Sequence, residues 1–540
     1  MRTRVFGACL AAVWLAAYGM QVSVSAQAGT AQAGQPGATP AAQAPQVRRL
    51  TDEEAVRLAL ENNLGIRIAR FDPQIQDLNV LSARAGWAPI FSSVYQQSNS
   101  EQPPNSLLSG ATVNVTQGQF LSDTGIQATL PRGGSYQIGW DATRTTTNNL
   151  LTSFNPQLRT NLSLNFTQPL LRGWDIDNIR QQLQTSMKNR EIADVDVRET
   201  LASTTRTVRR AYWDLAYAIA NLQVQRQSLD LAQESLRNTR ARVEIGTQPP
   251  IDVVADEAEV ATREEAVIVA EAAIAQAEDT LRALVFDPTS PDFWTMRIET
   301  TELPPFQTTT VDVDTAVRNA LSRRTDLDRA RKQIELNDVN VRFLRNQTLP
   351  DITAAFDYGL TAIGGTQIQR APTSNPFIPG EIIGETNRAF FPVLGDLFGF
   401  NAPRWTATLN VSYPLGTSTQ EANLARTRLQ QTQLRTQISQ QELNITTQVR
   451  QTARQVQTNQ QRVQTSRVSR ELAERRLDAE QRKFAAGTST NFLVFQAQRD
   501  LAQARNNELR ATLDYNQSVV DLETVQEVPL AGGGAAVPAR

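Results

Sequence analysis

The chain has 540 residues, of which 40% are hydrophobic, and its formal net charge is −2. So small a charge gives no electrostatic preference for nucleic acid, and no stretch of the body is apolar over the roughly 20 residues that a membrane-spanning helix needs. The chain has no histidine and a single cysteine, Cys9, so histidine metal sites, histidine bases and internal disulfides are excluded.

The N-terminal residues predict an export signal and a flexible leader. A basic start, MRTR, precedes a short apolar stretch over residues 5–18, and small residues at 24–26 offer a cleavage site. We therefore expect a signal peptide over residues 1–26, whose removal also removes Cys9. Residues 27–47 and the tail 528–540 are rich in small residues and proline, and we expect them to be disordered.

Between these ends the sequence repeats itself, which indicates a duplicated structural unit. We predict a first repeat over residues 48–310 and a second over residues 311–527. Four landmarks recur in one order. Ala55-Val56-Arg57 recurs as Ala316-Val317-Arg318, and Pro89 recurs as Pro350, both 261 residues later. Leu164-Asn165 with Pro169 recurs as Leu409-Asn410 with Pro414, 245 residues later, and Gly246 recurs as Gly487, 241 residues later.

Four segments alternate between apolar and polar residues, with the period of two that is typical of β-strands. A soluble sheet with one buried face explains this pattern, and so does a membrane barrel, whose strands need about ten residues. The segments are residues 90–98, 161–167, 352–360 and 405–413. Three tryptophans near strand ends, where membrane-interface aromatics belong, fit the barrel: Trp87, Trp174 and Trp405.

The first repeat carries an additional hairpin. Residues 126–130 and 136–140 alternate around a Pro-Arg-Gly-Gly turn, in a segment of 80 residues whose counterpart in the second repeat has 64. We predict an extracellular hairpin here and no change in the number of barrel strands. The counterpart loop, residues 362–402, is rich in Gly, Pro and Phe and is also expected to be extracellular.

Long helices follow each pair of strands. Leucine and valine recur every seven residues from Leu201 to Val243, and residues 178–245 would form a helix on the order of 100 Å long. The return segment has its own seven-residue spacing from Val253 to Leu281, and a second long helix is expected over residues 421–484. Sustained heptads predict coiled-coil packing, so each repeat should contain a long antiparallel helical hairpin.

The same dipeptide, Gly-Thr, ends both long helices. We expect Gly246 and Gly487 to adopt the left-handed conformation that terminates a helix. A Pro-Pro pair then prevents continuation of the first helix, and Asp252 lies in the first turn of the return helix, near the positive end of its dipole. In the second repeat, Thr488 or Ser489 is expected to cap the following helix.

Four strands cannot close a barrel, because about eight are the usual minimum. An open sheet edge in lipid would leave backbone polar groups unpaired, at several kcal/mol each. If the strands lie in a membrane, several copies of the chain must therefore share one barrel. Two copies would give eight strands with a filled interior, and three would give twelve strands with room for a lumen.

These features together resemble the TolC family of outer-membrane efflux and type I secretion channels. The resemblance extends over roughly residues 48–527, and it depends on the order and duplication of short motifs. The local matches are FTQPLLRG (166–173), VSYPLG (411–416), RVEIGT (242–247), FAAGTS (484–489) and the opening LTDEEAVRLALENN (50–63).

The resemblance implies a mainly α fold with a β-barrel portion. It implies a homotrimer in which four strands per protomer build one twelve-stranded outer-membrane barrel, continued into the periplasm by a tunnel of twelve helices in coiled-coil hairpins. Such a protein is a passive exit duct without cofactor, metal or catalytic residues, served by a periplasmic adaptor protein and an inner-membrane pump of the RND, ABC or MFS type. Tip residues that the resemblance places against the adaptor are Gly246, Thr247, Asp252, Gly487 and Thr488.

The chain departs from the family at the second tip. An acidic ring described in some members would fall at Leu493 and Gln496, which carry no charge, so we assign no gating residues there. The alternative function is a periplasmic coiled-coil scaffold or adaptor with a soluble sheet domain, but adaptors usually carry one helical hairpin. We expect no enzymatic activity, since no pocket-forming constellation accompanies the carboxylates and no Gly-rich phosphate loop has the required spacing.

Overall fold

The computed structural model describes residues 47–103, 114–301, 306, 308, 310–372, 380–416 and 418–527. The predicted signal peptide, residues 27–46 of the leader and the tail 528–540 lie outside these residues. None of the helices formed by the described residues is long and apolar enough to cross a membrane.

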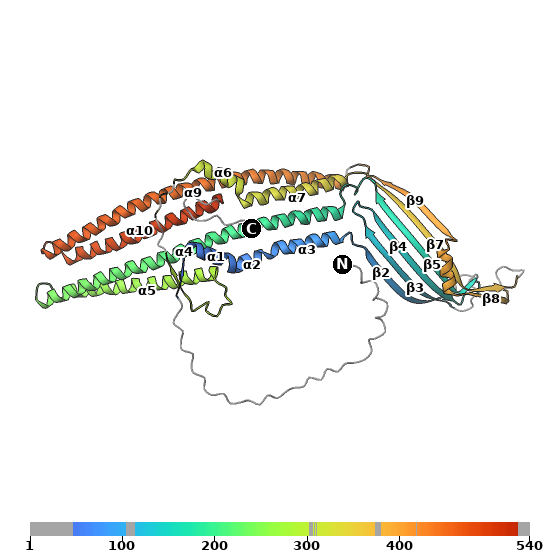
Figure 1. The fold of residues 1–540 in the computed structure, drawn as a ribbon, viewed down its shortest axis with the longest axis horizontal. Helices are drawn as coiled ribbons and strands as arrows, with labels where there is room; N and C mark the ends of the chain where they lie inside the picture. Colours follow the sequence, from blue (N-terminus) through green and yellow to red (C-terminus); the bar gives the residue numbers. More distant parts are fainter. Residues whose placement is uncertain are drawn as a thin grey trace, which may run out of the picture. The chain divides into compact units, whose positions relative to one another are not determined.

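Seven strands of the described residues form one antiparallel sheet, in the order β2-β3-β4-β5-β7, with both β8 and β9 paired to β7 (Figure 1). Their bounds are β2 Ile90–Gln102, β3 Val115–Thr129, β4 Ser135–Thr147, β5 Phe154–Pro169, β7 Asp351–Arg370, β8 Ile382–Arg388 and β9 Pro403–Ser412. β9 pairs with the first half of β7 and β8 with its end. The six strands β2, β3, β4, β5, β7 and β9 therefore lie side by side, and we call them the six-stranded wall.

The four strands expected from alternation are confirmed as β2, β5, β7 and β9, but the prediction of four strands per protomer is wrong. The additional hairpin is β3 and β4, which are inserted between β2 and β5 and pair with them along their length. Its turn lies at the helix end of the sheet, where Gln168 Nε2 donates to the carbonyl oxygen of Arg132 at 3.0 Å. An extracellular hairpin would turn at the opposite end, so the hairpin is part of the wall and not a loop upon it.

Directly opposed residues in a sheet share one face, and the register of the wall separates two faces of different chemistry. One row, which defines the apolar face, runs Phe91, Ile126, Ile138, Leu164, Tyr358 and Trp405. The adjacent row, which defines the polar face, runs Ser92, Gly125, Gly139, Ser163, Gly359 and Arg404. At this level of the sheet the alternation expected for four strands thus extends across all six. Elsewhere on β2, Ile90 and Val94 lie on the polar face and are exposed.

The predicted loop 362–402 contains ordered elements that return to the sheet. After β8, the helix α8 (Phe390–Phe398) packs Val393 and Leu397 against Leu360 and Ala362, on the apolar face of β7. A Cβ atom on Gly364 would overlap the Val393 side chain, so the absent side chain of this glycine lets the helix approach the strand. The difference in length between the two segments is therefore smaller than the inserted hairpin, because the segment of the second repeat contains β8 and α8 in its place.

Two helical hairpins form as expected from the heptads. They are α4 (Asn178–Glu244) with α5 (Ile251–Val285), and α9 (Thr419–Ala485) with α10 (Asn491–Gln526). The return helices are about half as long as α4 and α9. The remaining half of each long helix packs against α3 (Phe71–Ala85) or α7 (Thr325–Gln347), so that α3, α4, α7 and α9 lie in one row (Figure 1).

The short elements pack around the middle of the long helices. They are β1 Val47–Leu50, α1 Asp52–Asn62, α2 Leu64–Ala69, β6 Arg297–Thr300 and α6 Val313–Arg323. β1 pairs in parallel with β6, and the largest apolar core lies beneath them, where Leu50 and Tyr212 are fully buried. Tyr212 Oη also donates to the carbonyl oxygen of Leu50 at 3.1 Å. The contact between Leu50 and Tyr212 therefore holds the N-terminal strand β1 against α4.

Polar contacts join the sheet to the helices. Arg172, just after β5, forms a 2.6 Å ion pair with Asp351 at the start of β7. The N–H of Gly173 donates to Asn346 Oδ1 of α7 at 2.6 Å. Four connections link the row of helices to the wall, from α3 to β2, β5 to α4, α7 to β7 and β9 to α9. The strands and helices therefore follow the same order.

Candidate functional site

The first helix tip, between α4 and α5, ends α4 with a left-handed glycine. Gly246 has a φ of +76°, and its N–H donates to the carbonyl oxygen of Val243 at 2.9 Å. The N–H and the hydroxyl of Thr247 both donate to the carbonyl oxygen of Arg242, at 2.8 and 2.9 Å. Two carbonyl groups at the helix end are thereby satisfied, in the pattern of a Schellman motif.

The second tip, between α9 and α10, repeats this geometry. Gly487 has a φ of +77° and donates to the carbonyl oxygen of Phe484 at 3.0 Å. The N–H and the hydroxyl of Thr488 donate to the carbonyl oxygen of Lys483, at 2.9 and 3.1 Å. The repeated Gly-Thr dipeptide is therefore explained by one hydrogen-bonded turn that needs a left-handed residue followed by a hydroxyl.

The prediction that Thr488 or Ser489 caps α10 is wrong. The Thr488 hydroxyl is bound to the end of α9, and the Ser489 hydroxyl donates to Glu480 Oε2 at 2.8 Å. The residue at the cap position is Thr490, whose side chain makes no capping bond. In the first tip, Asp252 does lie in the first turn of α5, as expected.

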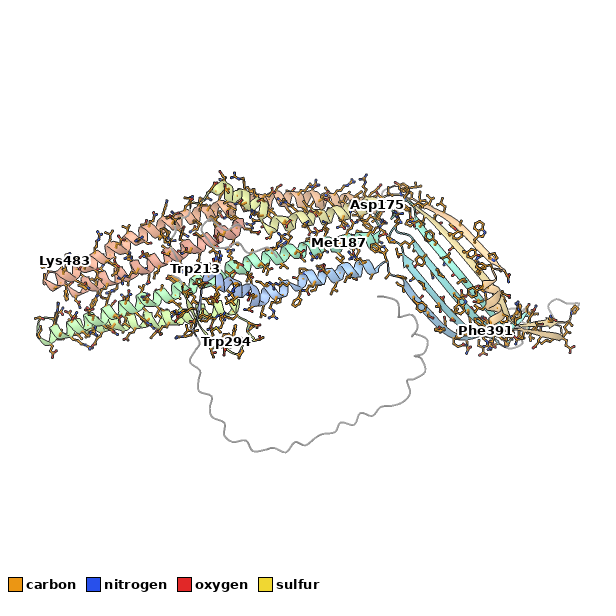
Figure 2. The ribbon with its side chains drawn as sticks, in the orientation of Figure 1. Asp175, Met187, Trp213, Trp294, Phe391 and Lys483 are labelled. Carbon is orange, nitrogen blue, oxygen red and sulfur yellow. The ribbon has the colours of Figure 1, made fainter. Side chains whose placement is uncertain are left out.

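Side chains join the two tips within the protomer, at the end of the helices where Figure 2 labels Lys483. The guanidinium of Arg242 lies over the ring of Phe484, 4.6 Å from its centroid, in a cation–π contact. Asn491 Nδ2, at the start of α10, donates to Asp256 Oδ1 of α5 at 2.8 Å. The two hairpins are therefore joined at their tips by a half-buried cation–π contact and a buried hydrogen bond.

The buried contact contains the carboxyl group of Asp256, whose charged form is disfavoured by burial. Asp256 is 0% exposed. Burial raises the pKa of Asp256 above its ordinary value, the charges of Asp252 and Glu259 raise it further, and hydrogen bonds with Thr239 and Asn491 act in the opposite direction. The protonated form of Asp256 is therefore favoured in the joined tips more than it would be in water.

Sequence reasoning missed Asp256 and Asn491, although a signal for the first was present. The heptad positions of α5 run through Val253 and Val260, and Asp256 stands at the intervening core position, where an apolar residue is expected. Asn491 gave no comparable signal, because it follows the tip before any periodicity begins. Leu493 and Gln496, the uncharged positions of the absent acidic ring, are exposed in the first turns of α10.

Two of the three tryptophans lie at the helix end of the wall, and the third lies farther along it. Trp87 precedes β2 and Trp174 follows β5, so both are at the helix end of the sheet. Trp405 lies on the apolar face of β9, opposite Tyr358, and is 67% exposed. The tryptophans therefore occupy two levels, and their contact with a membrane interface stays a prediction.

The apolar face of the wall is exposed to a degree that is unusual for a soluble protein. Its uncovered side chains come from all six strands: Phe91, Tyr95, Phe120, Ile126, Ile138, Phe166, Phe356, Trp405, Leu409 and Val411. α8 covers the part around Leu360, and its own Phe391 and Phe398 are exposed, at 80% and 58%. A surface of this kind requires an apolar surrounding.

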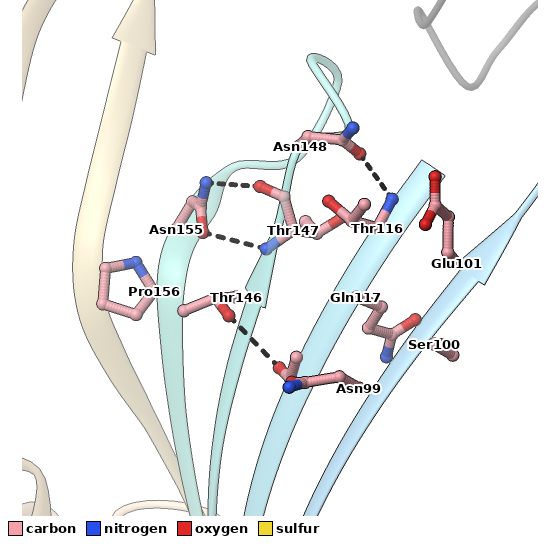
Figure 3. Close-up of a pocket in the computed structure, with 11 residues that line it drawn as sticks. Asn99, Ser100, Glu101, Thr116, Gln117, Thr146, Thr147, Asn148, Asn155 and Pro156 are labelled. Atoms are coloured by element: carbon pink, nitrogen blue, oxygen red, sulfur yellow. Dashed lines mark hydrogen bonds between the residues drawn. The ribbon is translucent and has the colours of Figure 1, made fainter. Parts of the chain in front are cut away.

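The far end of the wall, away from the helices, is polar. A depression there is lined by Asn99, Ser100, Glu101, Thr116, Gln117, Gly118, Thr146, Thr147, Asn148, Asn155 and Pro156 (Figure 3). The side chain of Asn155 exchanges two hydrogen bonds with the backbone of Thr147, at 2.6 and 3.2 Å, and so extends the pairing of β4 with β5. The depression consists of strand ends, and the side chains of Thr146, Asn148 and Asn155 bond to backbone atoms within it.

Comparisons with known proteins agree with this architecture. A family model described as "Outer membrane efflux protein" matches residues 55–285 and again residues 316–525. Among curated protein sequences, none matches the chain. Several solved structures share the fold at low identity. The Campylobacter jejuni CmeC outer membrane channel is 12% identical with a TM-score of 0.61, and the match covers 88% of this chain and 85% of that one.

Two further structures give the same result. The outer membrane protein VceC from Vibrio cholerae is 17% identical, with a TM-score of 0.59 and coverage of 89% of this chain and 97% of that one. The Neisseria gonorrhoeae MtrE outer membrane channel is 16% identical, with the same TM-score and coverage of 89% of each chain. The family model covers both halves of the chain, and the chain therefore belongs to the outer membrane efflux protein family, whose members are transport channels and not enzymes.

Proposed function

We propose that the chain is the outer-membrane exit duct of a tripartite efflux or type I secretion system and that three copies assemble around one aqueous passage. The observation that carries this proposal is the wall with one exposed apolar and one polar face. In a membrane the apolar face contacts hydrocarbon, and the polar face lines the passage. A lone protomer would leave both edges of the wall unpaired in lipid, so assembly is obligatory.

The helices continue the passage through the periplasm in this proposal. Their row follows the order of the strands that it joins, and the hairpin tips lie farthest from the wall (Figure 1). The tip residues Gly246, Thr247, Asp252, Gly487 and Thr488 are proposed to meet a periplasmic adaptor protein. An inner-membrane pump of the RND, ABC or MFS type supplies the energy.

Replacing Gly487 by valine tests the role of the tips. A non-glycine residue at a φ of +77° costs about 1–2 kcal/mol of backbone strain, whereas nothing lies within 4 Å of a Cβ atom there. We expect the distorted tip to lower dye efflux about fivefold or more in cells that depend on this channel, without loss of the assembled trimer. Efflux is measured as the rate of dye release from preloaded cells.

The matched control is Ala486→Val, since Ala486 precedes the glycine and has an ordinary φ of −83°. It should leave efflux close to the wild-type rate. Cells lacking the chain should retain the dye altogether. Unchanged efflux with Gly487→Val would show that the tips are not the working end, and unchanged efflux in cells lacking the chain would refute the transport role.

A further inference from the structure

We propose that the outer-membrane barrel of this protein has six strands per protomer and so eighteen strands in a trimer. The inference rests on the proposed function as a trimeric channel, but it goes beyond it in naming the width of the passage and the edges that join the protomers. The seam pairs β9 of one protomer with β2 of the next. Three observations support it. The inserted strands have one apolar and one polar face, like their neighbours. They contact the rest of the sheet along their whole length, and the widened wall matches the row of helices in width.

The inserted hairpin has the chemistry of a membrane wall. On the apolar face, β3 and β4 present Phe120, Ile126, Ile138 and Trp140. On the polar face they present Gln119, Asp123, Gly139 and Asp141. A hairpin in water outside the cell would need no apolar side aligned with that of its neighbours. The two strands therefore face the same two environments as β5 and β7.

Hydrogen bonds join the hairpin to β5, and another joins β3 to the end of β4 at the far end of the wall. In its middle, Trp140 Nε1 donates to Thr160 Oγ1 at 2.9 Å, and Asn161 Nδ2 donates to Asp141 Oδ2 at 2.7 Å. At the far end, the N–H of Thr116 donates to Asn148 Oδ1 at 2.9 Å, beside the Asn155 pair (Figure 3).

At the helix end, the hairpin turn packs against the segment that follows β5. Gly133 has a φ of +79°, and a Cβ atom there would overlap the carbonyl oxygen of Gly173. α8 lies over Trp140 and binds the hairpin to β7 of the second repeat. Removal of the hairpin from the wall would break contacts at every level of the sheet.

Six strands match the width of the row of helices more closely than four strands do. Four helices, α3, α4, α7 and α9, reach the wall in each protomer, and packed helices lie about 8–10 Å apart, which gives a row about 32–40 Å wide. Six strands at a spacing of about 4.8 Å and a tilt of about 40° occupy about 38 Å of circumference, whereas four occupy about 25 Å. The inserted hairpin therefore widens the wall to the width of the helices beneath it.

The two edges of the wall fit each other. β2 runs away from the helices and β9 runs toward them, so copies placed side by side pair these edges in the antiparallel sense. The repeat predicts the register. Phe166 of β5 lies opposite Phe356 of β7, and the offsets of 245 and 261 residues map this pair onto Val411 of β9 and Tyr95 of β2. Both side chains lie on the apolar face, and they are 64% and 70% exposed.

An eighteen-stranded barrel has a different capacity from one of twelve strands. Barrel diameter grows roughly linearly with strand number, from about 24 Å to about 36 Å between backbone atoms at the same tilt. The cross-section of the lumen is then larger by about 2.2-fold. Barrels of 16–18 strands enclose an aqueous channel by themselves, so the wall sets no narrow limit on the size of the cargo.

Engineered disulfides from a single position, Gln96 on the polar face of β2, test the proposal in the full-length protein with Cys9 replaced. The same register that pairs Tyr95 with Val411 places Gln96 opposite Asn410 of the neighbouring protomer. A four-stranded wall without the hairpin would instead place Gln96 opposite Asn161, as Asp357 lies opposite Thr406 in the second repeat. Opposed residues are about 4.5–5.5 Å apart between Cα atoms, within disulfide range, whereas three strand spacings are about 14 Å.

We expect Gln96→Cys with Asn410→Cys to give a covalent trimer on a denaturing gel, and Gln96→Cys with Asn161→Cys to give no disulfide. The positive control is Asp357→Cys with Thr406→Cys, which should cross-link within each protomer. A disulfide between positions 96 and 161 would overturn the six-stranded wall while leaving the channel intact. A covalent dimer as the largest product would also overturn eighteen strands. If a cysteine at position 96 forms no disulfide with a cysteine at position 408, 410 or 412 of another protomer, the shared barrel itself is refuted.

Discussion

Replacing Phe356 by arginine is expected to abolish recovery of the assembled protein from the outer membrane, whereas replacing its neighbour Asp357 by arginine is expected to leave recovery nearly unchanged. Both side chains are exposed in the protomer, Phe356 on the apolar face at 41% and Asp357 on the polar face. Phe356 is five residues from the start of β7 at Asp351, about half the length of a spanning strand.

The magnitude follows from the depth of the substitution. An arginine facing lipid near the bilayer midplane costs about 2–4 kcal/mol in an outer-membrane barrel. A trimer carries three such side chains, so the assembly loses about 6–12 kcal/mol, which is comparable with the whole stability of a typical domain. Asp357→Arg places the same side chain in the aqueous lumen, where it remains hydrated.

The measurement is the amount of heat-modifiable trimer on an unheated gel of the outer-membrane fraction. Protein with Phe356→Arg should be missing from that band, and protein with Asp357→Arg should be present at close to the wild-type amount. Equal recovery of the two variants would mean that the apolar face does not contact lipid.

In the proposed channel the passage is entered between the hairpin tips, and replacing Asp256 by alanine is expected to separate the tips and so open this periplasmic entrance. The change leaves Asn491, which is buried at the junction of the tips, without the acceptor that it uses at 2.8 Å. A buried polar group left unpaired costs about 1–3 kcal/mol, which the separated tips recover because water then solvates the amide. A shift of this size raises the open population about 5–150-fold.

Asp256→Asn is the matched variant, because its side-chain oxygen still accepts from Asn491 and it carries no charge. Open probability is read from single-channel recordings of the purified protein in planar bilayers. It should rise strongly with Asp256→Ala and stay at or below the wild-type value with Asp256→Asn. An equal increase in both variants would show that the negative charge, and not the hydrogen bond, holds the tips together.

The raised pKa of Asp256 also gives the pH dependence of the entrance a definite sign. The joined tips bind the proton more tightly than the separated tips, so protonation stabilises the joined state. That stabilisation is fully present below the ordinary aspartate pKa of about 3.9 and is lost as pH rises through the raised value. Acidification through this window should therefore lower the open probability of the wild type, and Asp256→Asn should remove this dependence.

The parts of the fold that follow from periodicity could be predicted from the sequence. Heptads gave the two hairpins because a buried seam forces one apolar residue every 3.5 positions, and Val208 and Leu215 of that seam are buried. Alternation gave β2, β5, β7 and β9 because each strand lies between two different environments. Gly246 and Gly487 were found because a left-handed helix end leaves few other choices of residue.

The misplaced hairpin and the missed contact share a physical cause. Whether β3 and β4 lie within the wall or above it depends on pairing with β2 and β5, which local pattern does not contain. The Asp256–Asn491 bond joins residues 235 apart in the chain, so the local sequence around either residue does not identify the other as its partner. Thr488 was assigned to the wrong helix because its bond to the end of α9 depends on the left-handed backbone conformation at Gly487.

Single-cysteine labelling along β5 tests most directly whether the wall separates lipid from an aqueous lumen. Each variant, with Cys9 replaced, is treated in outer-membrane vesicles with a water-soluble maleimide. We expect labelling with a period of two: reaction at the polar-face positions 161, 163 and 165, and none at the apolar-face positions 162, 164 and 166. Equal labelling of Phe166→Cys and Asn165→Cys would contradict it, because the apolar face would then be in contact with water.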